Sequence, residues 1–291
     1  MTPPPDRDPL PTCVKDLEPL PDVYVATVRA GLDAALRDDD PTAVAVGHRR
    51  SQSLSEATPE EAAAGLTEAQ FEAIGDHARL LLAWNRAVNL SGIRLPEMIA
   101  RDHVLDSLAA VPLLRRYRID EFIEIGSGGG YPGLPLALAL PARRALLVES
   151  IAKKARFLAA AVAAVGLGDR VAVVAARAET VAADTRHRGR WQAVVARAVA
   201  DLPQLSELSL PLARVGGLLV AWKRRPLDDE LARAEPALRQ LGGRIATLWP
   251  VTVPGLEDHV LVVVEKMTET PPEFPRDPAE RRRHPLYGRP C

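Results

Sequence analysis

A glycine-rich loop at residues 126–133 (GSGGGYPG) is the part of the sequence best suited to bind a ligand. It follows a short apolar run at 122–125 and precedes an apolar stretch at 134–140, which predicts a strand, a loop and a helix in that order. Glycines accept positive φ angles and let a ligand lie against the main chain, and the first helical turn offers N–H groups without partners. We therefore predict a nucleotide site at this loop, contacted by Gly126 and Gly128.

A carboxylate closes the next predicted strand. Glu149 follows the apolar run 145–148, and in a doubly wound sheet this strand end lies beside the loop. A carboxylate can accept hydrogen bonds from both hydroxyls of a ribose, so we predict that Glu149 binds the ribose of the nucleotide. Gly128, Gly130 and Gly133 also have the GxGxxG spacing of dinucleotide-binding enzymes, which leaves an NAD-dependent oxidoreductase as an alternative.

The elements around these residues predict an α/β fold. From residue 119 onward strands alternate with helices, which implies a mostly parallel sheet covered on both faces. The last two strands have no helix between them, so an antiparallel pair should lie at one edge. This closing pair, and the lack of a second domain for a hydride acceptor, favour the methyl donor S-adenosylmethionine over NAD. The predicted strands are 122–125, 145–148, 170–175, 192–196, 217–222, 245–251 and 259–265.

Two helices are predicted before the sheet. Thr67 and Gln70 have the pattern of a capping box and precede apolar residues at helical spacing. A second helix should begin at Pro96, a residue suited to a first helical turn. We expect these elements, within residues 67–115, to form an accessory layer on a Rossmann-like, seven-stranded sheet.

Composition divides the chain of 291 residues into three parts. Residues 1–61 carry twelve acidic and six basic residues, which leaves 26 acidic and 31 basic residues in the remainder. We predict an acidic extension at 1–62 that is disordered as a whole, with a short helix around 23–36 as an alternative for that part, a single catalytic domain at 63–268 and a basic, proline-rich tail at 269–291. Two cysteines near opposite ends provide neither a disulfide framework nor a metal site, and no apolar run is long enough for a membrane span. We expect a cytoplasmic monomer.

Several motifs, in order along residues 66–286, resemble the RsmG (GidB) family of 16S ribosomal RNA methyltransferases. The resemblance implies the class I S-adenosylmethionine-dependent methyltransferase fold and transfer of a methyl group to guanosine N7 at position 527 of 16S ribosomal RNA. One departure is Arg224, because family members commonly carry glycine after the lysine that matches Lys223. The motifs are the series 84–90, His103 with 105–107, the loop 126–133, residues 149–157, 177–179 and 196–198, Lys223, and the tail residues 270–286.

The resemblance also implies where the cofactor is held. Family contacts map to Gly126 and Tyr131 in the loop, to Ala178 with Glu179 after the third strand, and to Arg197 after the fourth. An arginine at a strand end also has an ordinary alternative role, because a buried guanidinium needs a partner and often forms a salt bridge.

The chemistry requires positioning more than proton transfer. Guanine N7 has a free lone pair at neutral pH, so it can attack a sulfonium methyl group without a general base, and we predict no catalytic acid, base or metal. The RNA partner, 16S ribosomal RNA or the small ribosomal subunit, should be met by basic groups at strand ends and helix starts, of which Lys153, Arg177 and Lys223 are the candidates. Trp222 could stack a splayed base, although a core role is the more common one.

Three other functions remain open at this point: methylation of another RNA or a small molecule, NAD-dependent oxidation, and non-catalytic RNA binding. Binding of S-adenosylhomocysteine as against NAD separates the first from the second.

Overall fold

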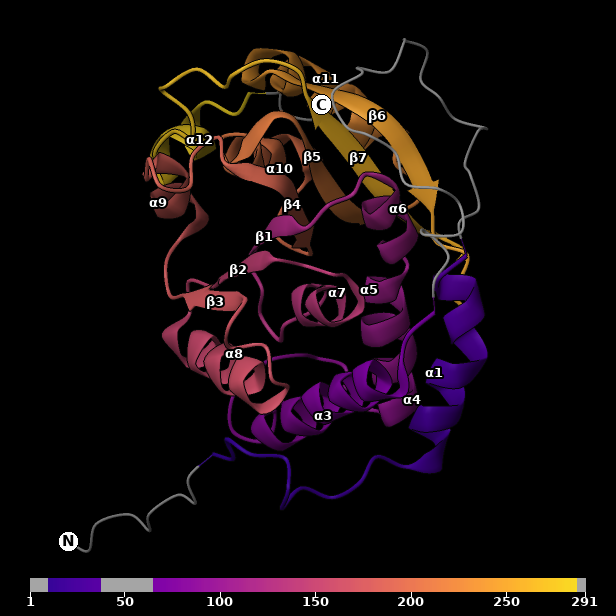
Figure 1. The fold of residues 1–291 in the computed structure, drawn as a ribbon. Helices are drawn as coiled ribbons and strands as arrows, with labels where there is room; N and C mark the ends of the chain where they lie inside the picture. Colours follow the sequence, from indigo (N-terminus) through magenta and orange to yellow (C-terminus); the bar gives the residue numbers. More distant parts are fainter. Residues whose placement is uncertain (1–9, 38–64, 287–291) are drawn as a thin grey trace, which may run out of the picture.

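The computed structural model describes residues 10–37 and 65–286, which build an α/β fold around a seven-stranded sheet (Figure 1). The strand order is β3-β2-β1-β4-β5-β7-β6, and β7 runs antiparallel to both of its neighbours while the other pairs are parallel. This arrangement confirms the predicted fold class. The strands are β1 (Glu121–Ile125), β2 (Arg144–Val148), β3 (Val171–Val174), β4 (Trp191–Arg197), β5 (Ala213–Arg224), β6 (Gly243–Pro250) and β7 (His259–Lys266).

Helices cover both faces of the sheet, so its central strands are apolar on both sides. Alternate residues of β1 point into separate cores, with Phe122 in one and Ile123 in the other. The Phe122 core includes residues from α7 (Gly133–Ala139) and α8 (Ala152–Ala164). The helices that contribute to the Ile123 core are α9 (Ala178–Ala183), α10 (Leu202–Ser209) and α11 (Asp228–Leu241).

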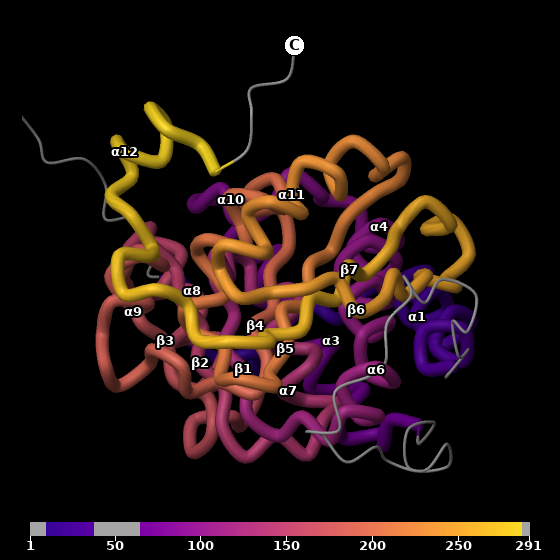
Figure 2. Tube along the Cα trace, turned by 90° about the horizontal axis from the view of Figure 1, so that it is seen from above, coloured from indigo at the N-terminus to yellow at the C-terminus, as the bar shows by residue number. Residues whose placement is uncertain are grey.

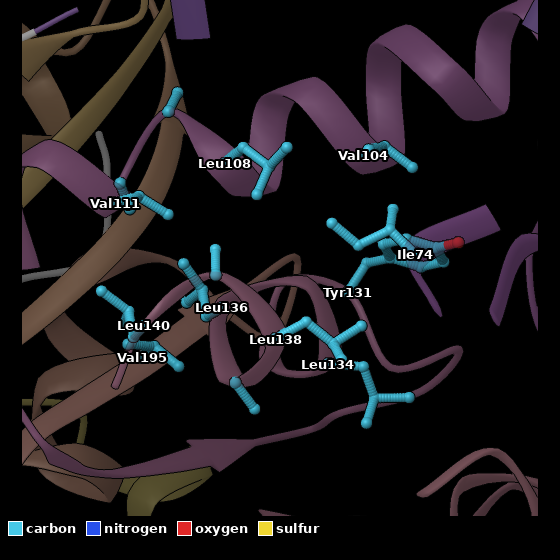
Figure 3. Packing of buried hydrophobic residues seen from close by; sticks show 14 of the residues in the cluster. Ile74, Val104, Leu108, Val111, Tyr131, Leu134, Leu136, Leu138, Leu140 and Val195 are labelled. Carbon is cyan, nitrogen blue, oxygen red and sulfur yellow. The ribbon is translucent and has the colours of Figure 1, made fainter. Parts of the chain in front are cut away.

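The predicted accessory layer packs on α7. Figure 3 shows Ile74, Val104 and Leu108 of this layer facing Leu134 and Leu136 of α7. The capping box of Thr67 and Gln70 is present, and the chain from Pro96 onward is helical but includes one π-helical segment. The elements of the layer are α3 (Glu68–Trp84), α4 (Pro96–Met98), the π-helix η2 (Ile99–Leu105), α5 (Asp106–Leu108) and α6 (Val111–Arg116).

The N-terminal segment differs from its prediction as a disordered extension over the part that the structure describes. Residues 22–35 form α1 (Asp22–Ala35), which packs against η2 at one side of the molecule (Figure 1). Tyr24, Val28 and Ala35 recur at helical spacing and are buried, and this apolar stripe supplies the reason for the packing. Residues 1–9 and 38–62 lie outside the described part of the chain.

The C-terminal tail runs along the α9 and α10 side of the sheet and ends in α12 (Pro278–Arg283), which lies beside α9 (Figures 1 and 2). Arg188 donates to the carbonyl oxygens of Thr270, Pro271 and Phe274 at 2.6–3.0 Å. Arg276 forms a salt bridge with the buried Glu207 at 2.8 Å. The tail up to residue 286 is therefore fastened to the domain, and residues 287–291 lie outside the described part.

Within residues 10–37 and 65–286, no helix combines the length and apolar composition that a membrane span needs.

Candidate functional site

The glycine-rich loop has the backbone shape that the sequence predicts. Gly126, Gly128 and Gly130 have φ angles of 70°, 53° and 81°, in the left-handed region that favours glycine. At Gly126 a Cβ atom would also lie 2.8 Å from Cγ2 of Val199, so a side chain has no room there. The loop follows β1 directly and turns into α7, which places its main chain at the carboxyl end of the sheet.

Glu149 lies against the loop, as expected for a ribose ligand. Its buried carboxylate accepts hydrogen bonds from the backbone N–H of Gly128 at 2.9 Å and of Ile151 at 2.8 Å. Each bond goes to a different oxygen, and each carboxylate oxygen has more than one lone pair, so both oxygens can accept a further hydrogen bond. Glu149 thus shapes the loop and keeps the capacity to bind a pair of hydroxyls.

A cleft of about 580 Å³ opens above the loop at the carboxyl ends of the strands. It is bounded on one side by the loop and on the other by the ends of β4, β5 and β7 and by the accessory layer. Several of the predicted residues meet here, whereas Lys153, Glu149, Arg177, Ala178 and Glu179 lie outside the lining of the cleft. The predicted residues in the lining are Gly126, Gly128, Tyr131, Arg197, Trp222 and Lys223.

Arg197 ends β4 and is held by three groups from the accessory layer. Its Nη1 donates to Oδ2 of Asp106 and to the carbonyl oxygen of Asp102, both at 2.8 Å. Its Nη2 donates to Nδ1 of His103 at 2.9 Å. The salt bridge considered for this residue is present, with Asp106, and Arg197 also lines the cleft, where its contact with the cofactor stays a prediction.

Tyr131 lies in a stack of three aromatic rings. The ring of His77 is 4.3 Å from it on one side and that of His103 is 4.7 Å away on the other, measured between centroids. Burial lowers the pKa of His77 to about 4 and that of His103 to about 3, the latter with a contribution from the positive charge of Arg197. Both imidazoles are therefore neutral at pH 7, and they buttress the loop from the accessory layer.

A buried carboxyl group, Glu124, lies beneath the loop. It accepts a hydrogen bond from the backbone N–H of Gly133 at 3.1 Å, and burial raises its pKa to about 7. A Cβ atom on Gly133 would lie 2.3 Å from Oε2 of Glu124, so this contact also requires glycine. Reasoning from the sequence assigned no role to Glu124, although its place just before the loop was a usable signal.

The sequence reasoning also missed three residues of the site. His77 donates to the carbonyl oxygen of Gly129 from 2.8 Å, while Asp106 and His259 bond to each other at 2.8 Å across the base of the cleft. Asp106 was noticed within a motif but given no role. Its two partners are 91 and 153 residues away in the chain, so no local pattern indicates either contact.

Comparison with known proteins identifies the family. Residues 70–248 match the model of the GidB family, described as rRNA small subunit methyltransferase G. The chain belongs to this family. The ribosomal RNA small subunit methyltransferase G of Roseiflexus sp. (strain RS-1) is 43% identical over 76% of this chain and 94% of its own length. Its namesakes from Roseiflexus castenholzii and Chloroflexus aggregans are 44% and 41% identical, covering 72% and 76% of this chain and 89% and 92% of theirs.

Membership of the GidB family confirms the resemblance found in the sequence, and with it an S-adenosylmethionine-dependent methyltransferase of ribosomal RNA. The NAD-dependent oxidoreductase is thereby set aside. Among residues 10–37 and 65–286, no cluster of three or more histidine, cysteine, aspartate or glutamate side chains is arranged to hold a metal ion.

The residues in the lining of this GidB-family cleft, together with Glu149 beside the loop, fit the cofactor chemically. The loop presents main chain without side chains at Gly126, Gly128 and Gly129, which gives a nucleoside room to lie against it. Glu149 offers acceptors for ribose hydroxyls, and the guanidinium of Arg197 offers donors for a carboxylate.

The cofactor contacts predicted at Ala178 and Glu179, which would face the adenine, lie outside the lining of the cleft. Ala178 and Glu179 begin α9 after β3, as expected from the sequence. The carboxylate of Glu179, however, forms an ion pair with Arg281 of α12, so the fastened tail reaches this edge of the GidB-family site. If Glu179 binds the adenine, its carboxylate has to do so while it is paired with Arg281.

The three candidates for RNA contact differ in their surroundings. Lys153 on α8 and Arg177 at the start of α9 are exposed to solvent. Lys223 lines the cleft but is mostly buried, and its ammonium group donates to Glu230 at 2.5 Å and to the carbonyl oxygen of Ala200 at 2.8 Å. Trp222 is buried and donates from Nε1 to the carbonyl oxygen of Asp106 at 2.9 Å, so it is a fixed wall of the cleft.

Proposed function

We propose that this protein transfers the methyl group of S-adenosylmethionine to N7 of guanosine 527 in 16S ribosomal RNA, and that it does so in the cytoplasm on the small ribosomal subunit or its RNA. The observation that carries the proposal is the cleft between the glycine-rich loop and Arg197 at the carboxyl edge of the sheet, in a chain of the GidB family. The base and position in the RNA follow from the resemblance of the motifs.

The reaction needs a nucleophile, an electrophile and their alignment. S-adenosylmethionine supplies a methyl group on a positively charged sulfur. Guanine N7 attacks with its lone pair, so no proton has to leave first, and the protein needs no general base. Holding the reactants in line can supply roughly 7 to 11 kcal/mol of the barrier reduction in favourable cases. Residues that bind and orient therefore matter more than residues that exchange protons.

We assign the cofactor to the main chain of Gly126 and Gly128, with Glu149 on the ribose and Arg197 on the carboxylate of the amino-acid end. Tyr131 stands behind the loop, fixed by its two histidine neighbours. Ala178 and Glu179 form the adenine side. The support is the position of each group at the loop or at the adjoining strand ends.

RNA contacts fall to the basic groups around the cleft. Lys154 and Arg224 line it. Lys153 on α8 and Arg177, the residue before α9, are exposed, so phosphates can approach them from solvent. Lys223 was a candidate for RNA contact in the sequence, but its charge is already paired with Glu230, so we do not assign it to the RNA. We assign it to holding the end of β5 in place.

The direct test is methylation of small-subunit RNA. Ribosomal subunits from cells that lack this methylation are incubated with the protein and tritiated S-adenosylmethionine, and N7-methylguanosine is mapped by borohydride reduction and aniline cleavage. Cleavage at position 527 alone supports the proposal. Incorporation at another nucleotide, or none into any form of 16S RNA by protein that binds S-adenosylhomocysteine, refutes it.

Arg197→Ala is the companion variant. It should weaken binding of S-adenosylhomocysteine in calorimetry, because it removes the guanidinium that we assign to the carboxylate of the cofactor. Unchanged affinity would exclude Arg197 from the cofactor site.

A further inference from the structure

Asp106 connects the accessory layer to the ends of three neighbouring strands. Its Oδ2 accepts from Arg197 at the end of β4, and its Oδ1 accepts from Nδ1 of His259 at the start of β7. Its carbonyl oxygen accepts from Nε1 of Trp222 near the end of β5. The side chain is buried and both carboxylate oxygens are used, so this one residue fixes the floor of the cleft where the three strand ends meet.

The π-helical turn before Asp106 frees a second acceptor for Arg197. In an α-helix the N–H of Asp106 would bond to the carbonyl oxygen of Asp102, four residues earlier. Here it bonds to the carbonyl oxygen of Arg101, five residues earlier, and to that of His103, three residues earlier. The carbonyl oxygen of Asp102 instead accepts from Nη1 of Arg197. Short π-helical segments within α-helical stretches are frequent at functional sites.

His103 supplies the third acceptor, and its hydrogen bonds fix its tautomer. A guanidinium can only donate, so Nδ1 of His103 must accept from Arg197 and carry no proton. The remaining ring nitrogen, Nε2, then carries the proton and donates to Oγ of Ser91 at 2.7 Å. Arg197 is therefore oriented by one carboxylate, one carbonyl and one neutral imidazole, all from a single stretch of five residues.

The donor count shows what remains for a ligand. A guanidinium has five N–H groups, and the three bonds to Asp106, Asp102 and His103 use both hydrogens of Nη1 and one of Nη2. The N–H of Nε and one N–H of Nη2 are left on a side chain that lines the cleft. Two donors on one planar group suit the two oxygens of a carboxylate.

We propose that Asp106 is a positioning residue for cofactor binding: with the π turn that precedes it, it holds Arg197 so that its two remaining N–H groups receive the carboxylate at the amino-acid end of the cofactor. This inference rests on the proposed function for the identity of the ligand. The proposal predicts that a change at Asp106 weakens binding of the amino-acid end of the cofactor only. A general folding defect would weaken binding of the adenosine end as well.

The test uses two ligands that differ in that end. S-adenosylhomocysteine carries the carboxylate, whereas 5′-methylthioadenosine has the same adenosine and sulfur without the amino-acid portion. Asp106→Asn removes the negative charge that pairs with the guanidinium of Arg197 and leaves one oxygen acceptor in place of two, so Arg197 is held less firmly. We expect affinity for S-adenosylhomocysteine in calorimetry to fall by roughly 10-fold or more and affinity for 5′-methylthioadenosine to change less than about twofold.

Three further variants make the result decisive. Glu265→Gln breaks another carboxylate–arginine pair, between the buried Glu265 of β7 and Arg244 of β6 and outside the lining of the cleft, and should lower the melting temperature while leaving both affinities unchanged. Asp106→Asn combined with Arg197→Gln should bind S-adenosylhomocysteine no more weakly than Arg197→Gln alone, because Asp106 acts through Arg197. Arg197→Lys keeps the charge beside Asp106 but loses the paired donors, so it should fold and still lose affinity for S-adenosylhomocysteine.

Equal losses for the two ligands in Asp106→Asn, additive losses in the double variant, or full affinity in Arg197→Lys would each overturn the proposal. Calorimetry uses no RNA, so its outcome is independent of the substrate. Wild-type protein that binds S-adenosylhomocysteine but leaves 16S RNA unmethylated would refute the proposed function and leave the positioning of Arg197 standing.

Discussion

Replacing His77 with glutamine should remove an acid-sensitive contribution to the stability of the fold. His77 is fully buried on α3, where Nε2–H donates to the carbonyl oxygen of Gly129 and Nδ1 has no hydrogen-bond partner. Protonation would place an N–H group and a positive charge in this apolar surrounding. Burial therefore lowers the pKa of His77 from 6.5 to about 4.

The magnitude follows from proton linkage. Above pH 6.5 the imidazole is neutral in both the folded and the unfolded chain, so it makes no pH-dependent difference. As the pH falls below 6.5 the unfolded chain binds the proton first, and stability is lost until the pH reaches the folded pKa. With a pKa of 6.5 in the unfolded chain and about 4 in the folded protein, the unfolding free energy falls by about 2 kcal/mol at pH 5 and by about 3 kcal/mol well below pH 4, relative to its value at neutral pH.

The assay is urea denaturation of wild type and His77→Gln at pH 7.5 and pH 5. Glutamine keeps an N–H donor for the carbonyl oxygen of Gly129 but does not titrate. Burial raises the pKa of Glu124 to about 7, so this group has the opposite effect: its contribution to the unfolding free energy is lost as the pH rises from 4.5 to 7. Glu124 and His103 are present in both proteins, so the difference between them isolates His77.

Relative to the variant, wild type should lose about 2 kcal/mol of unfolding free energy between pH 7.5 and pH 5. Parallel pH dependence of the two proteins would refute the reasoning, because it would mean that His77 takes up its proton as readily in the folded state as in the unfolded chain.

Three other changes should have effects of known direction. Gly133→Ala should lower the unfolding free energy by about 1 to 3 kcal/mol, because its Cβ would lie 2.3 Å from Oε2 of Glu124, whereas Gly168→Ala, with open space around it, should be nearly neutral in the same denaturation experiment. Glu149→Gln should weaken calorimetric binding of S-adenosylhomocysteine by roughly 10-fold, since a charged acceptor for the ribose is lost, and unchanged affinity would remove it from the site. Lys153→Ala should reduce affinity for 16S RNA and flatten its salt dependence while sparing S-adenosylhomocysteine; an effect on the cofactor instead would contradict its place on the RNA side.

Local patterns in the sequence were enough to predict the sheet and the loop. The apolar runs agree with the seven strands to within a few residues, and the glycines of the loop need positive φ angles that the sequence already suggested. The position of Glu149 against the loop was predictable because neighbouring strand ends of such a sheet lie side by side, while its role toward the ribose stays a prediction. These features depend on residues that are neighbours in the chain.

Contacts between distant segments were not predictable in the same way. Asp106 and His259 are 153 residues apart, and Glu179 and Arg281 are 102 apart, so neither pair leaves a local signal. The π turn is a shift of one residue in helical hydrogen bonding that no periodicity reveals. For α1, prolines and aspartates on either side outweighed a short apolar stripe whose partner, η2, lies much later in the sequence.

The position of β7 between β5 and β6 has a consequence for synthesis on the ribosome. Until residues 259–266 emerge, β6 has no strand to pair with and β5 presents an open edge, although most of the chain has already been made. Nascent chains that stop before this point should therefore be prone to association through the exposed edge, and the cleft floor that includes His259 is completed only as the last strand docks.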